Sequence, residues 1–236
     1  MSTVPRETPS ESSARTRIDT VLFDFGNVLV TWDPYAAYAG RMARADVEAF
    51  FEAVDFPTFN ARQDAGRSWA DARRALAEHH PEHVSMLDVY TENFAASLVG
   101  PVPGTQEIVR ELRTLGVRLY GLTNWSAEMF HEAEPAAPAI GLMEDVLVSG
   151  RVGLVKPDPR IFEAACAAFG VAPGSAVYVG DRLRTDAIGA AAAGLTGVWL
   201  NRDGSTPSPE DAADAAALGV IEIATLAELT PALLAR

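Results

Sequence analysis

Short apolar runs that end in polar residues recur along the chain, and they constrain its fold more than any other feature. The first run is Val21-Leu22-Phe23, which ends at Asp24, and similar runs follow at 119–122, 146–148, 176–179 and 197–200. Such runs are typical of strands buried on both faces. Helical patterns separate them, at 106–115, 160–169 and 185–193, with a glycine placed after each as a C-terminal cap. This alternation predicts βαβ units and an α/β fold, a Rossmann-like parallel sheet flanked by helices.

Residues 33–100 interrupt the alternation. Helical patterns occur there at 46–54, 68–80 and 84–98, with Ser68 placed as an N-cap, and no strand pattern is evident. We therefore predict an all-helical cap over 33–100, inserted into an α/β core made of 18–32 and 101–236. Outside these patterns, 1–17 is rich in Ser, Thr, Pro and Glu and predicts a disordered leader. An edge strand at 218–223 and a short helix at 226–234 complete the expected core.

The charge balance narrows the range of partners. The 236 residues include 19 basic and 32 acidic ones, a formal net charge of −13. A diffuse basic surface for nucleic acid is excluded, and anionic membranes should repel such a chain. No secretory signal or bilayer-spanning apolar stretch is evident, and a single cysteine, Cys166, fits a reducing compartment. We expect a cytoplasmic monomer or homodimer whose partner is a small molecule.

Polar residues follow the expected strands at the edge where open α/β sheets bind their ligands. They are Asp24, Asn27, Thr123, Asn124, Asp181 and Asp186, with Lys156, the only lysine in the sequence, in the loop after the third run. Taken singly, each has an ordinary explanation, since an Asp at a strand end often caps a turn or a helix. Their joint occurrence in this order indicates one site that combines three carboxylates with a cation.

At these residues the chain resembles the haloacid dehalogenase superfamily of aspartyl-nucleophile hydrolases. The segments VLFDFGNVL, GLTN, VKPDP and VGDRLRTD are similar to its four motifs, and the likeness covers about residues 18–225. The stretches LTNWSAE and VSGRVGLVKPDPRIFE resemble one subfamily, in which a helical cap follows the first strand. The motifs are specific for the superfamily and much less specific for the substrate.

The resemblance implies a phosphatase that acts on a small phosphorylated metabolite. Asp24 would attack phosphorus and form an aspartyl-phosphate. The Thr123 hydroxyl, the backbone N–H of Asn124 and the Lys156 ammonium would bind the phosphoryl oxygens.

The resemblance also implies a Mg²⁺ cofactor. Asp24, the backbone carbonyl of Gly26 and Asp181 would hold the ion, and Asp186 would support it directly or through another ligand. A divalent cation at this place removes the repulsion between a carboxylate nucleophile and a phosphate dianion.

One position departs from the family pattern. Most phosphatases of the superfamily carry a second Asp two residues after the nucleophile, as general acid and base, and this chain has Gly26 there. A general acid contributes about 10²–10⁴ in rate. The substrate could have a good leaving group, as in the sugar-1-phosphate phosphatases that the FDFGNV segment resembles. Alternatively, another group could supply the proton, or phosphatase activity could be low.

Two other functions stay open. A metal-independent 2-haloacid dehalogenase would use Asp24 to attack carbon, and its halide leaving group needs no acid. Asp181 and Asp186 count against it, because clustered carboxylates without a cation repel one another, and because dehalogenases of this scaffold replace the metal-binding Asp. A non-catalytic binding protein with the same fold is the third reading.

Within the insert, QDAGRSW at 63–69 predicts a polar turn that faces the substrate. Its Arg67 is a candidate for binding a carboxylate or a sugar hydroxyl, although a solvated arginine at a helix end is the commoner role. The aromatic residues of the insert are expected to form the cap core. Trp32 and Trp125 follow the first two strands and are equally suited to line the pocket or to pack in the core.

Overall fold

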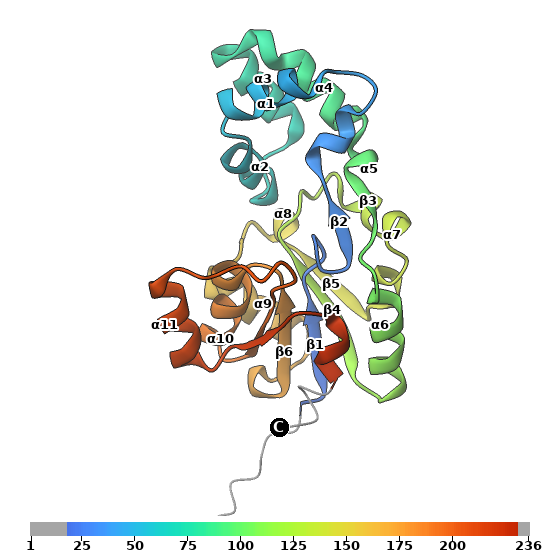
Figure 1. Ribbon diagram of the computed structural model, residues 1–236, viewed down its shortest axis with the longest axis vertical. Helices are drawn as coiled ribbons and strands as arrows, with labels where there is room; N and C mark the ends of the chain where they lie inside the picture. Colours follow the sequence, from blue (N-terminus) through green and yellow to red (C-terminus); the bar gives the residue numbers. More distant parts are fainter. Residues whose placement is uncertain (1–17, 231–236) are drawn as a thin grey trace, which may run out of the picture.

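A six-stranded parallel sheet forms the centre of the molecule in the computed structural model, which describes residues 18–230 (Figure 1). The strand order is β5-β4-β1-β6-β7-β8. The strands are β1 (Thr20–Phe23), β4 (Arg118–Thr123), β5 (Asp145–Val148), β6 (Ala176–Gly180), β7 (Thr196–Leu200) and β8 (Ile221–Ile223). β1 pairs in parallel with both β4 and β6. The order of connection therefore reverses at β1, whose carboxyl end is a topological switch point.

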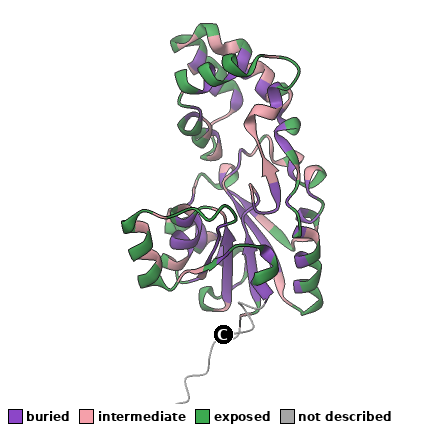
Figure 2. Ribbon diagram, in the orientation of Figure 1, coloured by how far each residue is buried: buried purple, intermediate pink, exposed green. Residues whose placement is uncertain are grey.

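The pleat of the sheet explains the apolar runs. Val21 and Phe23 share one apolar cluster with the buried face of α6 (Thr105–Thr114), whereas Leu22 belongs to another cluster with α9 (Pro159–Phe169). Because successive side chains of a strand point to opposite faces, both faces of β1 need apolar residues. Figure 2 shows the central strands buried throughout. The predicted α/β fold is confirmed.

The remaining helices of the core differ in part from expectation. The pattern at 185–193 corresponds to a π-helical segment, Leu183–Ile188, followed by α10 (Gly189–Ala192). α11 (Pro209–Leu218) was not predicted, and the strand expected at 218–223 is confined to β8. α11 contains no buried residue, so it lacks the apolar periodicity that would have revealed it. Two short helices, α7 (Ala133–Ala136) and α8 (Ser149–Val152), lie in the connections that follow β4 and β5.

Helices also fill the insert, beyond the carboxyl ends of the strands (Figure 1). They are α1 (Arg44–Ala53), α2 (Phe56–Asp64), α3 (Trp69–His79), α4 (Val84–Glu92) and α5 (Phe94–Ser97). Ser68 caps α3 as predicted, since its side chain accepts a hydrogen bond from the backbone N–H of Asp71. The buried aromatic residues of these helices pack on one another, and the Phe51 and Phe56 rings stack with centroids 3.9 Å apart. α2 was not predicted, because it was assigned in part to the polar turn.

A short antiparallel ribbon joins the insert to the sheet. β2 (Val30–Trp32) pairs with β3 (Leu98–Pro101) at the two ends of the helical region. The expectation that 33–100 contains no strand was therefore wrong at its last residues, and the helix expected at 84–98 ends before Leu98. Such short strands show no clear alternation, and their pairing depends on a partner far away in the sequence. The exact boundaries of the cap and the core remain predictions.

The expected leader, 1–17, and the last residues, 231–236, lie outside the described part of the chain. The helix expected at 226–234 begins as a 3₁₀ turn at Leu226–Glu228. Thr225 caps the N-terminus of this turn in a capping box with Glu228. Within residues 18–230, no helix combines the length and the apolar character that crossing a bilayer requires. Cys166 is buried in α9 among apolar neighbours.

Candidate active site

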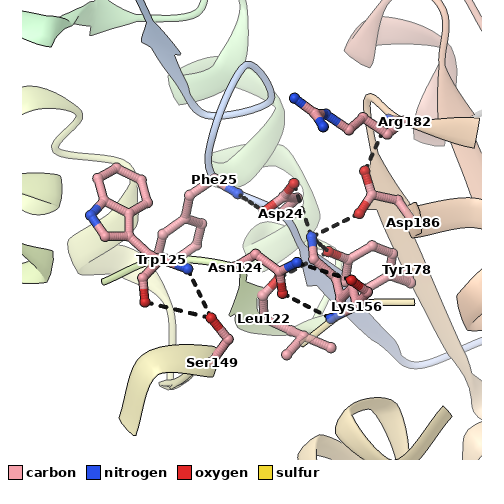
Figure 3. A network of polar contacts seen from close by, with 10 residues as sticks. All are labelled: Asp24, Phe25, Leu122, Asn124, Trp125, Ser149, Lys156, Tyr178, Arg182 and Asp186. Carbon is pink, nitrogen blue, oxygen red and sulfur yellow. Dashed lines mark hydrogen bonds and ion pairs between the residues drawn. The ribbon is translucent and has the colours of Figure 1, made fainter. Parts of the chain in front are cut away.

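Asp24 lies directly after β1, at the switch point of the sheet. Its backbone N–H donates to the carbonyl of Val179 in β6, at 2.9 Å, so the strand pairing continues through this residue. One carboxylate oxygen, Oδ1, accepts the backbone N–H of Phe25 at 2.7 Å. The other, Oδ2, lies 3.0 Å from Nζ of Lys156 (Figure 3). The carboxylate is thus oriented from two sides and retains 9% exposure toward the cavity.

Lys156 is a buried cation with three oxygen partners. Besides Asp24, its Nζ lies 2.7 Å from Oδ1 of Asp186 and donates to the Tyr178 hydroxyl at 2.6 Å. The Tyr178 hydroxyl in turn donates a hydrogen bond to the carbonyl of Leu122, at 2.9 Å. Burial lowers the pKa of Lys156, but the charges of Asp186 and Asp24 outweigh burial and raise it. The ammonium therefore stays charged at neutral pH.

Asn124 holds the backbone of Lys156 in place. Its Oδ1 accepts the N–H of Lys156 at 2.9 Å, and its Nδ2 donates to the carbonyl of the same residue at 3.1 Å. This two-point contact joins the loop after β4 to the loop after α8 (Figure 3). The predicted substrate-binding residue thus has a role that the sequence did not reveal, because its side chain positions the lysine.

Three carboxylates converge beside Lys156. Asp24, Asp181 and Asp186 each offer an oxygen, and these oxygens lie within 4.8 Å of one another. Asp186 lies in the π-helical segment, where its Oδ2 accepts the backbone N–H of Arg182 at 2.9 Å. Burial and the charges of Asp24 and Asp186 raise the pKa of Asp181 to about 7. The charges of Lys156 and Arg182 offset part of this repulsion. Clustered carboxylate oxygens of this kind fit a hard divalent cation such as Mg²⁺.

A cavity of about 520 Å³ covers this cluster. The predicted site residues that the structure brings together in its lining are Asp24, Gly26, Thr123, Asn124, Lys156, Asp181 and Asp186. Aromatic residues form the opposite wall, among them Phe51 and Phe56 from the insert. Both Trp32 and Trp125 also line it, and the buried Nε1 of Trp125 has no hydrogen-bond partner within residues 18–230. A largely aromatic wall with a few polar groups is typical of a small-molecule site.

Two of the singled-out residues, Arg67 and Asn27, use their side chains in local contacts, and of the two only Asn27 lines the cavity. Arg67 does not line the cavity, since its guanidinium donates to Oε1 of Gln63 and to the carbonyl of Phe59 and lies over the Phe59 ring. Asn27 adopts a left-handed conformation, φ 55°, and its side chain accepts the backbone N–H of Trp32. These contacts shape the turns that carry them.

The structure adds residues that sequence reasoning missed. Tyr178 could have been suspected, because a phenol in an otherwise apolar strand needs a buried partner. Ser149 carried no comparable signal, and the sequence indicated Asp64 only as a member of the polar turn predicted at 63–69. Ser149 accepts the backbone N–H of Trp125 at 2.9 Å and donates to the carbonyl of Asp64, so it links the insert to the core. Asp64 lies in the predicted polar turn and lines the cavity.

With this geometry established, comparison with known proteins places the chain in a family. A family model described as haloacid dehalogenase-like hydrolase matches residues 18–194. The chain belongs to the haloacid dehalogenase-like hydrolases. This family assignment confirms the resemblance that the four motifs carry.

Curated relatives of this hydrolase are phosphatases. A glyceraldehyde 3-phosphate phosphatase of Methanopyrus kandleri is 30% identical over 202 residues, covering 78% of this chain and 84% of the relative. A phosphoserine phosphatase of Thermus thermophilus is 39% identical over 112 residues, which cover 48% of this chain and only 45% of the relative. These matches agree with the expected phosphatase class of hydrolase.

Solved structures share the same fold. A dehalogenase crystallised as an intermediate complex has a TM-score of 0.68 and 22% sequence identity, and the match covers 92% of this chain and 97% of that one. At this identity the similarity establishes the fold and not the reaction.

Proposed function

We propose that this hydrolase is a Mg²⁺-dependent phosphatase that acts on a small phosphorylated metabolite through an aspartyl-phosphate on Asp24. The observation that carries the proposal is the arrangement around Asp24, whose carboxylate contacts a buried lysine and lies within 4.8 Å of two further carboxylates. A dehalogenase acting without a metal would have to tolerate that repulsion. The phosphatase relatives support the same class of substrate.

The reaction would proceed in two displacements. An oxygen of Asp24 attacks phosphorus as the bond from phosphorus to the leaving-group oxygen breaks, and that oxygen takes a proton. Water then attacks the aspartyl-phosphate, the bond between phosphorus and Asp24 breaks, and inorganic phosphate leaves. The Phe25 N–H orients Asp24 throughout, while Lys156 balances the charge of the carboxylate and the phosphoryl oxygens.

The metal would be held by Asp24 and Asp181, with Asp186 and the carbonyl of Gly26 as the other candidate oxygen donors. When bound, Mg²⁺ would reduce the electrostatic repulsion between the carboxylate nucleophile and the phosphate dianion. Thr123, which ends β4 and lines the cavity, would donate its hydroxyl to a phosphoryl oxygen. The indole N–H of Trp125, which has no hydrogen-bond partner among residues 18–230, favours a metabolite that also bears a hydroxyl or carbonyl acceptor, as a sugar phosphate does. The single cysteine, which fits a reducing compartment, supports a cytoplasmic location.

A panel of phosphorylated metabolites tests the proposal. Phosphate release with Mg²⁺, lost on chelation and lost in Asp24→Asn, is the expected result. Halide release from 2-chloropropionate that survives a chelator would identify a dehalogenase instead. Metal binding without turnover in either assay would identify a non-catalytic protein.

A further inference from the structure

Hydrolysis of an ordinary phosphate ester needs a proton donor for the leaving oxygen, and Gly26 cannot supply one. Four carboxylates line the cavity: Asp24, Asp64, Asp181 and Asp186. Asp24 contacts Lys156, and the other two members of the acidic cluster converge beside it. Asp64 is the cavity carboxylate that stands outside this cluster. It reaches the cavity from the insert, opposite the sheet.

The backbone of Asp64 is fastened to the core. Asp64 is the last residue of α2, and its carbonyl accepts the Ser149 hydroxyl at 2.6 Å. The Ser149 hydroxyl in turn accepts the backbone N–H of Trp125, in the loop that follows Thr123 at the end of β4 (Figure 3). Close to this contact, a Cβ on Gly66 would lie 3.3 Å from the carbonyl of Gly150, so the two segments touch through glycines. Asp64 is therefore held at a defined place over the site rather than on a free loop.

The side chain of Asp64 has few fixed partners. Its Oδ2 accepts the Asn60 amide at a long 3.2 Å, and the backbone N–H of Ser126 faces the carboxyl group. No arginine or lysine forms an ion pair with it among the contacts of residues 18–230. A carboxyl group held in this way can exchange its proton with a ligand in the cavity.

We propose that Asp64 is the general acid and base of the phosphatase, in place of the aspartate that Gly26 lacks; this inference rests on the proposed function. In the first displacement, the Asp64 carboxyl gives its proton to the leaving-group oxygen as the bond from that oxygen to phosphorus breaks. In the second displacement, the Asp64 carboxylate takes a proton from the attacking water. The proton balance closes over one turnover, with an alcohol and inorganic phosphate as products.

The electrostatic surroundings suit both roles. Burial raises the pKa of Asp64 to about 7, with a further contribution from the negative charge of Asp24. Lys156, Arg182 and the Ser126 N–H act in the opposite direction. A cation on Asp24 would cancel part of its repulsion, but the contribution of burial would remain. A group that is populated in both protonation states near neutral pH can act as acid and then as base.

Position 26, where most related phosphatases carry the general acid, can accept an aspartate in this chain. A Cβ built on Gly26 meets no atom within 4 Å, and the φ of Gly26 is negative, so an aspartate fits there without strain. Gly26→Asp therefore creates the acid found in most phosphatases that the chain resembles. The variant allows rescue of an Asp64 substitution from a different element.

The test compares two leaving groups in the holoenzyme with Mg²⁺. p-Nitrophenyl phosphate releases a phenolate that needs little protonation, whereas glycerol phosphate releases an alkoxide that does. Asp64→Asn is expected to lower kcat/KM for glycerol phosphate by about 10²–10⁴ and for p-nitrophenyl phosphate by less than about 10-fold. Wild-type kcat/KM for glycerol phosphate should fall above about pH 7, where the acid is lost, and this limb should vanish in the variant. Asp46→Asn, an exposed carboxylate of α1, is the matched control and should behave as wild type.

Adding Gly26→Asp to Asp64→Asn is expected to restore part of the glycerol phosphate activity. Equal losses on both substrates, or no loss on either, would overturn the role of Asp64 while leaving the phosphatase intact. A wild-type protein that releases phosphate from no substrate would instead overturn the proposed function, and this inference with it. A melting temperature of Asp64→Asn at or above that of the wild type keeps the first comparison free of folding effects.

Discussion

At the scale of single residues, Lys156 is the buried cation that balances the charges of two carboxylates of the site. Its ammonium has oxygen partners on Asp24, Asp186 and Tyr178, all within 3.0 Å, and it is almost completely buried. A compact ammonium satisfies three oxygens in a small space, whereas a guanidinium is a broad plane with a fixed fork of donors. All the other Lys and Arg positions of the chain are arginine. We therefore attribute the lysine at this position to the space around it and not to the composition of the chain.

Lys156→Arg should therefore impair the enzyme although the charge is kept. We expect a loss of about 10²-fold in kcat/KM, comparable to removing one pre-organised donor. Steady-state phosphate release measures it, with the exposed Arg113→Lys as control. Turnover near that of wild type would contradict the argument that this niche requires an ammonium.

At the scale of elements, the end of β6 and the π-helical segment after it are built to approach closely. A Cβ on Gly180 would lie 2.3 Å from Cβ of Asp186 and 2.4 Å from its Cγ. Real side-chain carbons do not come so near, so the absence of a side chain at 180 is what lets Asp186 reach Lys156. The wide π turn places this buried carboxylate facing the strand end.

Gly180→Ala should accordingly damage the site from within the sheet. Forcing a methyl group against Asp186 is expected to cost about 1–3 kcal/mol of unfolding free energy and to weaken the ion pair with Lys156. Gly174→Ala is the control, because its Cβ meets nothing within 4 Å, and it should stay within about 1 kcal/mol of wild type. Urea denaturation compares the two, and equal stability would refute the steric argument.

At the scale of the whole molecule, the site forms where three parts of the chain meet. The segments that follow the strands of the core contribute the carboxylates and the lysine. The β2–β3 ribbon brings the chain out of the core, and the insert adds aromatic residues of the wall and Asp64. Contacts such as Trp69 Nε1 donating to the Ser126 hydroxyl, at 3.0 Å, hold the insert against the core. The clustered carboxylates are therefore enclosed between core and insert, and their mutual repulsion lowers the free energy of unfolding of the whole molecule.

Metal binding should consequently stabilise the molecule. At 100 times its dissociation constant, Mg²⁺ is expected to add about 2.7 kcal/mol, which corresponds to roughly 5–10 °C in a chain of this size. Thermal unfolding with and without Mg²⁺ measures the shift.

Asp181→Asn is the control, because it should remove the stabilisation by Mg²⁺ without lowering the unfolding temperature of the metal-free protein. Because the pKa of Asp181 is raised to about 7 in the fold, its ionised form destabilises the metal-free protein, and that cost is complete above this pH. At pH 8 without metal, the variant should unfold at or above the wild-type temperature, and Mg²⁺ should no longer raise it. A metal shift that persists in Asp181→Asn would place the ion elsewhere.

The sequence by itself determined the architecture and the chemistry at the strand ends. Apolar runs such as Val21-Leu22-Phe23, separated by helical patterns, are typical of a parallel sheet covered on both faces, and parallel strands bring their carboxyl ends to one edge. That physical constraint was enough to group Asp24, Lys156 and Asp181 without coordinates. It could not reveal α11, whose surface carries no apolar period, or the β2–β3 ribbon, whose short strands depend on a distant partner.

Only the tertiary structure decided which cap residue faces the reaction. Asp64 and Arg67 lie three residues apart in one polar turn, and the sequence singled out the arginine there as a candidate for binding a carboxylate or a sugar hydroxyl. The end of α2 turns Asp64 into the cavity and leaves Arg67 bonded to Gln63 and Phe59. Burial and neighbouring charges depend on the packing of separate segments, so the pKa that fits Asp64 for proton transfer exists only in the folded molecule.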